Sequence, residues 1–248
     1  EMLGASNMGN ISLQAKLEGK SEKGKPFSTK AKAIVSSFSF NKYTYKNVSI
    51  DGNFDGYKFN GSADIADPNI RFNLAGLIDI SKKRPSYQFS ADIQNFAPNK
   101  LNLTKGYPTL TAALHMEANL QGDLMKNADG SVIFNNIVVK NKEKEFQLNN
   151  LTINALPAAE NNNRLDINSD LISGYVQGRF NFLKLPTDIT YIAARYLPSL
   201  WHTSEQYAAF NNFAFNLKID ADRADELFST LDMPVQIENG ATLEANVT

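Results

Sequence analysis

The sequence predicts an all-β fold, a mainly antiparallel and strongly curled sheet with one or two short helices. Apolar and polar side chains alternate with a period of two over most of the 248 residues, which is typical of strands with one buried face. Turn signals separate the alternating stretches, as expected for antiparallel strands joined by short connections. Asparagine, which disfavours helices and favours turns, is abundant.

Strand patterns follow one another from residue 11 to about residue 182, each with an apolar and a polar side. The polar side is rich in Lys, Asn, Ser, Asp and Gln. The alternating stretches are Ile11–Glu18, Phe27–Ala33, Val48–Phe54, Tyr57–Ile65, Ile70–Gly76, Tyr87–Ile93, Leu110–Leu120, Val132–Phe134, Phe146–Leu148, Leu151–Ile153, Leu165–Ile167 and Val176–Phe182.

Glycine recurs on the apolar side of these strands, at Gly52, Gly61, Gly76 and Gly178. Glycine in a strand interior often marks a bend or the close approach of another part of the chain. A sheet with glycine among Phe and Ile on one side can therefore curl toward that side. The same one-sided strands would also fit a closed sandwich in which the apolar side is ordinary core.

Two stretches near the C-terminal end have helical rather than alternating spacing. Pro186–Pro198 places Ile189, Ile192 and Tyr196 on one side, and Asp222–Leu231 begins with acidic residues that favour a helix N-terminus. Strands are expected at Phe213–Ile219 and Leu243–Val247. We expect one domain of a larger protein, with a curled β-sheet region at 1–185, a helix-containing insert with one strand (213–219) at 186–232, and the start of a following β segment at 233–248.

Composition excludes several kinds of chemistry. Cysteine is absent and the formal net charge is −1, which removes thiolate catalysis and gives no electrostatic reason for nucleic-acid binding. The two histidines, His115 and His202, have no recognisable partner set in the neighbouring sequence. No phosphate-binding glycine loop occurs. We therefore expect no catalytic residue, no metal, no cofactor and no enzyme activity.

No stretch has the roughly 20 apolar residues that a membrane helix needs. The best candidate, Ile189–Leu197, contains Arg195 and is followed by Pro198. The segment after Glu1 lacks the basic and apolar regions of a signal peptide. Any anchor or export signal is therefore expected outside this chain.

Three groups of segments carry a resemblance to a known family. They are strand-and-turn patterns and not catalytic signatures, so they bear on family and architecture more than on the role of any residue. The groups are Tyr45–Gly52 with Phe59–Gly61 and Asp67–Asp79, then Asn168–Phe180 with Arg195–Leu200, and finally Asp225–Phe228 with Ile237–Leu243.

These segments resemble the interior of a translocation and assembly module protein, TamB, of the AsmA-like family, in the form found in Bacteroidetes. The resemblance covers most of residues 45–248 and is weaker before them. It implies a periplasmic protein anchored to the inner membrane, with a long β-rich groove, or β-taco, that is apolar inside. It also implies transport of phospholipid to the outer membrane and work with an Omp85-type outer-membrane partner, through regions absent from this chain.

The leading hypothesis is therefore a non-enzymatic segment whose apolar groove holds phospholipid acyl chains. Two alternatives stay open: a scaffold for outer-membrane protein assembly or secretion, and a secreted ligand-binding β-sandwich. The sequence does not determine the lipid class. The residues expected to line the lipid groove are Ile50, Phe59, Ile65, Phe72, Leu74, Phe89, Leu114, Met116, Phe180 and Phe215.

Overall fold

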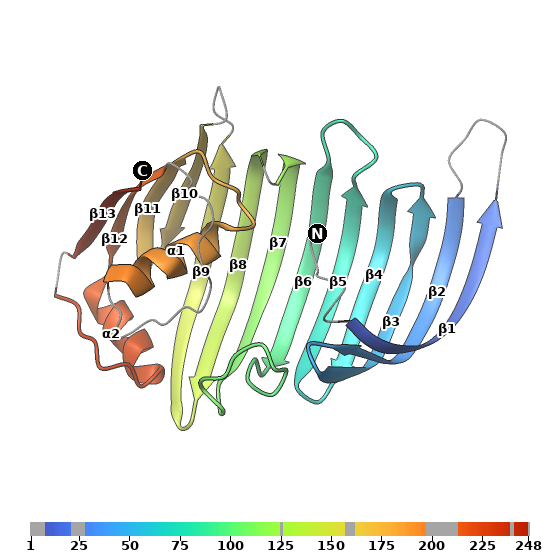
Figure 1. Cartoon of the computed structure of the whole chain (residues 1–248), viewed down its shortest axis with the longest axis horizontal. Helices are drawn as coiled ribbons and strands as arrows, with labels where there is room; N and C mark the ends of the chain where they lie inside the picture. Colours follow the sequence, from blue (N-terminus) through green and yellow to red (C-terminus); the bar gives the residue numbers. More distant parts are fainter. Residues whose placement is uncertain are drawn as a thin grey trace. The chain divides into compact units, whose positions relative to one another are not determined.

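The computed structural model describes residues 8–20, 28–124, 126–156, 162–196, 213–238 and 241–247. In this part of the chain, thirteen strands are hydrogen-bonded to one another in sequence order, and two short helices accompany them (Figure 1). The neighbouring strands from β1 to β6 and from β9 to β13 pair antiparallel. The predicted class, a mainly antiparallel and strongly curled sheet with one or two short helices, is confirmed.

The strands are longer than the alternating stretches alone indicated. Several reach 13 residues and β8 reaches 15. The bounds are β1 (Met8–Lys20), β2 (Ser28–Phe40), β3 (Tyr43–Asp55), β4 (Lys58–Asp67), β5 (Ile70–Asp79), β6 (Ser86–Phe96), β7 (Thr111–Asp123), β8 (Asn127–Asn141), β9 (Lys144–Leu156), β10 (Asn163–Ser169), β11 (Ile172–Gly178), β12 (Phe213–Ile219) and β13 (Thr242–Val247); the helices are α1 (Leu185–Tyr196) and α2 (Ala221–Thr230).

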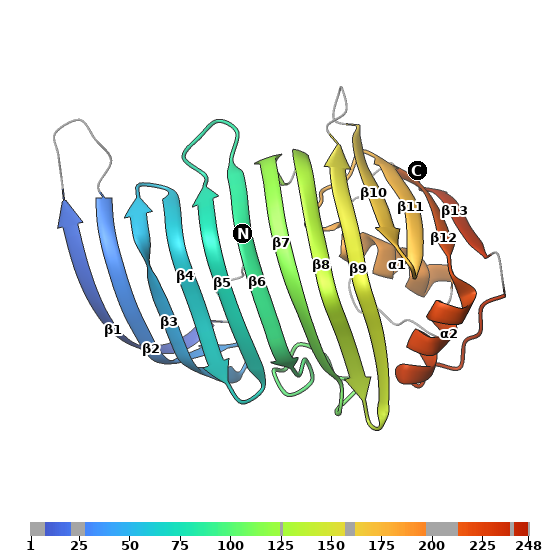
Figure 2. The same cartoon turned by 180° about the vertical axis from the view of Figure 1, so that it is seen from behind.

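The chain forms two compact units. The first contains 1–119 and 133–150, and the second contains 120–132 and 151–248. Strands β1–β6 belong to the first unit, whereas β10–β13 and both helices belong to the second. Figure 2 shows the same elements from behind.

In the first unit, the register of β1–β6 sorts the side chains into an apolar face and a polar face. Val48 pairs with Ile65, and Ile65 with Phe72. One position along, Ser49 pairs with Asp64, and Asp64 with Asn73. Because successive side chains of a strand point to opposite faces, rows of apolar side chains cross the strands on one face and rows of polar side chains cross them on the other.

Asparagines in the left-handed backbone region interrupt this alternation within three strands. Asn47 in β3, Asn95 in β6 and Asn136 in β8 have φ values of 53°, 51° and 52°. Asparagine tolerates this region better than most residues. At the first of these positions the β2–β3 ladder lacks the Ser36–Asn47 pair, while the register is the same on both sides of it, so the ladder is interrupted without an extra residue in either strand.

On either side of the left-handed Asn47, Tyr45 and Val48, three residues apart, lie in the same buried cluster with Leu101. The loop between β6 and β7 supplies Leu101, whose exposed fraction is 0%. Figure 1 shows β1, β2 and β3 bending strongly along their length. The bend brings the aromatic end of β2 and β3 against the rest of the sheet; the partly buried members of this cluster are Val35, Phe38, Phe40, Tyr43, Ile65, Ile70 and Phe96.

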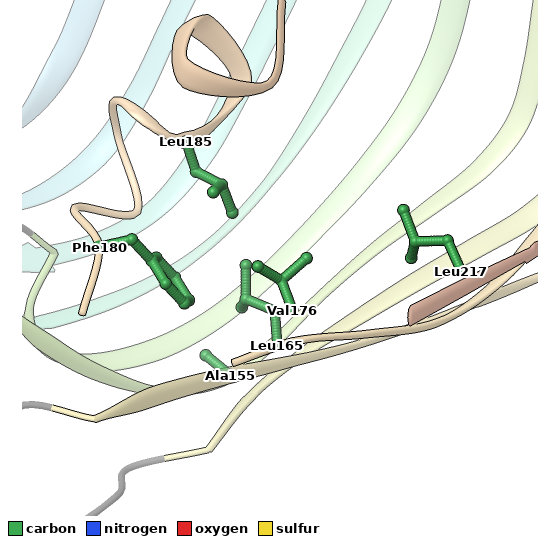
Figure 3. Close-up of a cluster of buried hydrophobic side chains, with 6 residues drawn as sticks. All are labelled: Ala155, Leu165, Val176, Phe180, Leu185 and Leu217. Carbon is green, nitrogen blue, oxygen red and sulfur yellow. The ribbon is translucent and has the colours of Figure 1, made fainter. Parts of the chain in front are cut away.

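The second unit has a closed core between its sheet and the segment that leads into α1. Val176 of β11 is fully buried, and it is covered by Phe180 of the connection that follows and by Leu185, the first residue of α1 (Figure 3). Ile192 of α1 packs against this core. The core residues drawn in Figure 3 are Ala155, Leu165, Val176, Phe180, Leu185 and Leu217.

Both predicted helices are confirmed, each with a start shifted by one residue. The α1 helix begins at Leu185, next to Pro186, which is well tolerated in a first turn. The α2 helix begins after Asp220, whose carboxylate accepts a 2.9 Å hydrogen bond from the Arg223 backbone N–H. Asp220, just before the predicted start at Asp222, is therefore the helix N-cap. No described helix is long and apolar enough to span a membrane.

Candidate functional site

The apolar face of β1–β6 has four parallel rows of side chains that cross the strands. The two outer rows carry large side chains, and the two inner rows are mostly Ala and Gly. Along a strand, the outer rows are six residues apart, or about 20 Å at roughly 3.3 Å per residue. In the order β1 to β6 the rows are Leu13, Val35, Val48, Ile65, Phe72, Ile93; Ala15, Ala33, Ile50, Ala63, Leu74, Ala91; Leu17, Ala31, Gly52, Gly61, Gly76, Phe89; and Gly19, Thr29, Phe54, Phe59, Ile78, Tyr87.

The glycines of the third row mark places where the sheet leaves no room for a side chain. A β-carbon at Gly61 would lie 2.3 Å from the Asp51 carbonyl oxygen and 2.4 Å from the Gly52 α-carbon. At Gly52 it would lie 2.6 Å from the Phe59 ring. The close approach of neighbouring backbones agrees with the curling that glycine on this face predicted.

Six of the predicted lining residues lie on this face within β3–β6. Ile65 pairs with Phe72, and Ile50 and Leu74 both pair with Ala63. Phe59 pairs with Phe54, with ring centroids 4.9 Å apart. Phe89 pairs with Gly76. All six predicted side chains are partly buried, so this face keeps some accessible apolar surface.

Leu114 and Met116 of β7 point to the same face, as deduced from their neighbour His115. The His115 ring contacts Asp92, whose strand neighbour Ile93 is on the apolar face. His115 is therefore on the polar face, and the residues on either side of it point the opposite way. Eight of the ten predicted residues thus share one face of the first unit.

The other two predicted residues, Phe180 and Phe215, belong to the second unit. Phe180 is 4% exposed and contacts the Phe182 ring in the closed core, so it has no open surface to offer a ligand. Phe215 lies in β12, where it pairs with Val176 and Ala245; its side chain is outside the described residues. Both residues therefore belong to a different unit from the other eight.

The apolar face is most open at β1. Leu13 and Leu17 are 55% and 65% exposed, and β1 is at the end of the strand order. Within the described part of the first unit there is no helix and no second sheet. Large apolar side chains that stay accessible in this way mark binding surfaces more often than ordinary exposed residues do.

The polar face carries a charged cluster centred on His115. Its Nδ1 is 2.8 Å from an Asp92 carboxylate oxygen, and its Nε2 is 3.3 Å from a Glu117 oxygen. The hydrogen bond to Asp92, helped by Glu117, raises the pKa of His115 above 6.5, while partial burial opposes the rise. The sequence next to His115 contains Glu117 but not the main partner, Asp92, which is on a different strand. His202 is outside the described residues.

A second polar group that the sequence did not indicate is the buried Asp67 at the end of β4. It accepts hydrogen bonds from the Tyr43 hydroxyl at 2.5 Å, the Lys46 backbone N–H at 3.0 Å and the Asn69 backbone N–H at 2.9 Å. Three donors satisfy the carboxylate, as burial requires. This arrangement is structural, because it holds the bent end of β3 against the β4–β5 turn.

Among the residues that the structure describes, no group of three or more His, Cys, Asp or Glu side chains could hold a metal ion. Comparison with protein-family models, with curated proteins and with solved structures gives no match for this chain. The candidate site is therefore defined by its geometry alone: an apolar face whose rows of side chains cross β1–β7, with a polar face behind it.

Proposed function

We propose that the apolar face of the first unit binds phospholipid acyl chains, as a non-enzymatic segment of a TamB-like, AsmA-like periplasmic protein that carries phospholipid between the inner and outer membranes. The observation that supports this is the register of β1–β6, which lines up apolar side chains across every strand. A face of this kind binds hydrocarbon through hydrophobic contacts. These contacts are non-directional, and their free energy is proportional to the apolar area that is buried. No single side chain should be essential.

The proposed site runs across the strands, along the rows of side chains, and not along any single strand. Between the row of Val48, Ile65 and Phe72 and the row of Phe54 and Phe59, the floor is mostly Ala and Gly. A hydrocarbon chain that lies across the strands would contact this floor and have larger side chains on both sides. Anchoring to the inner membrane and contact with an Omp85-type partner belong to the proposal through regions outside this chain.

The test is photocrosslinking from a photoreactive residue at Leu114 or Met116 in cells, with Lys16 and Lys32 as polar-face controls. The proposal expects lipid adducts at the first two positions and none at the controls. Mass spectrometry of lipids extracted from the purified protein then identifies their class. Equal adducts at all four positions, or none at any, would contradict it.

A pair of neighbouring substitutions separates binding from folding. Leu74 is on the apolar face, and Ala75 is exposed on the polar face between Ser62 and Ser90. Leu74→Asp puts a charge on the proposed binding surface, where desolvation opposes it, and should reduce lipid adducts at Met116. Ala75→Asp adds the same charge to the other face and should leave them unchanged. Circular dichroism shows whether each variant is folded.

A second candidate function, a scaffold for outer-membrane protein assembly, is favoured by the exposed apolar side chains of β1, which is the end strand of the described sheet. Exposed edge strands can accept a strand from another polypeptide. Crosslinks from Leu13 to protein and not to lipid would favour the scaffold. A carbohydrate-binding sheet has less support, because the polar rows of β1–β6 contain no aromatic residue.

A further inference from the structure

One end of β3–β6 carries two exposed apolar side chains next to each other. Tyr57 in the β3–β4 turn is 74% exposed, and Ile80, just after β5, is 51% exposed. The Ile80 backbone N–H donates a 3.1 Å hydrogen bond to the Tyr57 carbonyl oxygen, which fixes the two segments side by side. These residues are outside the strand rows, so the acyl-chain proposal does not use them.

Cations gather at the same end. Lys82, Lys83 and Arg84 are consecutive and exposed in the β5–β6 loop, seen at the top of Figure 1. Lys58 begins β4 next to Tyr57. Only two carboxylates, Asp55 and Asp79, lie in the strand ends that meet here. This end is therefore positively charged in a chain whose formal net charge is −1.

The loop is held to the sheet by Asp79, which is buried. Its carboxylate accepts 2.5 Å and 3.1 Å hydrogen bonds from the Ser81 hydroxyl and backbone N–H, and lies 3.2 Å from the Lys82 ammonium group. The Ser81 hydroxyl, assisted by Lys82, lowers the pKa of Asp79. The side chain of Lys82 is still 64% exposed. The beginning of the loop is therefore fixed to the end of β5, while the cationic side chains 82–84 stay exposed.

We propose that this end of the first unit, formed by Tyr57, Ile80 and the cations 82–84, docks on the surface of a bilayer that contains anionic phospholipid. Lysine and arginine side chains near a membrane surface are attracted to anionic headgroups. Tyrosine suits the boundary between headgroups and acyl chains, because its ring is apolar and its hydroxyl is polar. Isoleucine adds apolar area below the cations. Cations beside exposed apolar groups fit such a surface better than they fit a nucleic acid.

The docking end does not require that the apolar face hold acyl chains, so the two proposals fail independently. A protein that docks but carries no lipid would still sediment with vesicles. A protein that carries lipid but does not dock would still give adducts at Met116. The vesicle experiment below and the crosslinking experiment above therefore report on different surfaces.

The test is co-sedimentation of the full chain with vesicles of equal parts phosphatidylglycerol and phosphatidylcholine, and with vesicles of phosphatidylcholine alone. Docking predicts binding to the anionic vesicles that weakens as salt is added. The variant Lys82→Gln/Lys83→Gln/Arg84→Gln should bind them about tenfold or more weakly. Tyr57→Ser/Ile80→Ser should also weaken binding, with a smaller change in its salt dependence.

The matched control is Lys30→Gln/Lys32→Gln/Lys46→Gln, which removes three positive charges from the exposed polar face of β2 and β3. It should bind anionic vesicles like the unchanged protein. Equal loss in the control would mean that only overall charge matters and would overturn the proposal. Absence of binding to anionic vesicles would also overturn it, as would displacement by inorganic phosphate beyond that caused by sodium chloride at the same ionic strength, which indicates a site for free phosphate.

Discussion

The Tyr43 hydroxyl donates a 2.5 Å hydrogen bond to the carboxylate of Asp67, 24 residues further along the chain. Asp67 is 3% exposed and also accepts the Lys46 and Asn69 backbone N–H groups. Asn69 in turn donates to the Tyr43 oxygen at 3.0 Å. These bonds hold the bent end of β3 to the β4–β5 turn, and with it the aromatic cluster at that end of the apolar face.

Substitution of Asp67 should therefore destabilise the protein more than substitution of Tyr43. Tyr43→Phe removes the two hydrogen bonds of the hydroxyl, one donated to Asp67 and one accepted from Asn69, and should lower the free energy of unfolding by about 1–2 kcal/mol. Asp67→Ala leaves several buried donors without an acceptor and should cost about 3 kcal/mol or more. Urea unfolding followed by circular dichroism measures both. If Asp67→Ala cost no more than Tyr43→Phe, the network would not hold the bend.

The glycine row should not tolerate side chains. Gly61→Ala forces a β-carbon against the Asp51 and Gly52 backbone, which cannot move as freely as the end of a side chain. We expect a loss of about 1–3 kcal/mol in the free energy of unfolding. Gly106→Ala is the matched control, because its nearest neighbouring atom would be 4.0 Å away; it should be neutral or slightly stabilising. Equal stability of the two variants would contradict the close approach of β3 and β4.

The α1 helix offers a matched pair of substitutions on neighbouring turns. Ile192 packs against the core of the second unit, whereas Ile189 is 37% exposed. Ile192→Asp places a charge against apolar side chains and should cost a few kcal/mol. Ile189→Asp should stay within about 0.5 kcal/mol, the usual range for surface sites. A cost at Ile192 as small as that at Ile189 would mean that α1 does not depend on this contact.

His115 should make the stability of the first unit depend on pH. Because its folded-state pKa is raised above 6.5, the charged pair with Asp92 stabilises the fold fully below about pH 6.5. This contribution is lost as the pH rises through the folded-state pKa. The stability difference between the unchanged protein and His115→Gln should therefore be larger at pH 5.5 than at pH 8.5, as measured by urea unfolding.

An NMR titration of the imidazole signals gives the matching control. Asp92→Asn removes the main partner and should shift the pKa of His115 back toward 6.5. The His115→Gln spectrum identifies which signal belongs to His115, since the only other histidine is His202. An unchanged pKa in Asp92→Asn would show that the hydrogen bond to Asp92 does not cause the rise.

The sequence by itself determined the class of fold, most strand positions, the two helices and which side of each strand is apolar. Alternation such as Phe59, Gly61, Ala63 and Ile65 is a local property, because the backbone geometry of a strand sends successive side chains to opposite faces. The start of α2 also depends on local sequence, because the N-cap carboxylate of Asp220 accepts a hydrogen bond from an N–H group only three residues later.

Only the tertiary structure decided which apolar residues share a surface. Phe180 belongs to the same kind of alternating stretch as Phe72, yet it is buried in the closed core under α1, because the segment that follows β11 turns back over the sheet. Tyr45 joins Val48 because Asn47 adopts a left-handed conformation, which a spacing of two does not predict. Register between strands and the contacts of Asp67 and His115 depend on residues far apart in the chain. The stability of these long-range pairings and contacts is set by the packing around them and not by the local sequence pattern.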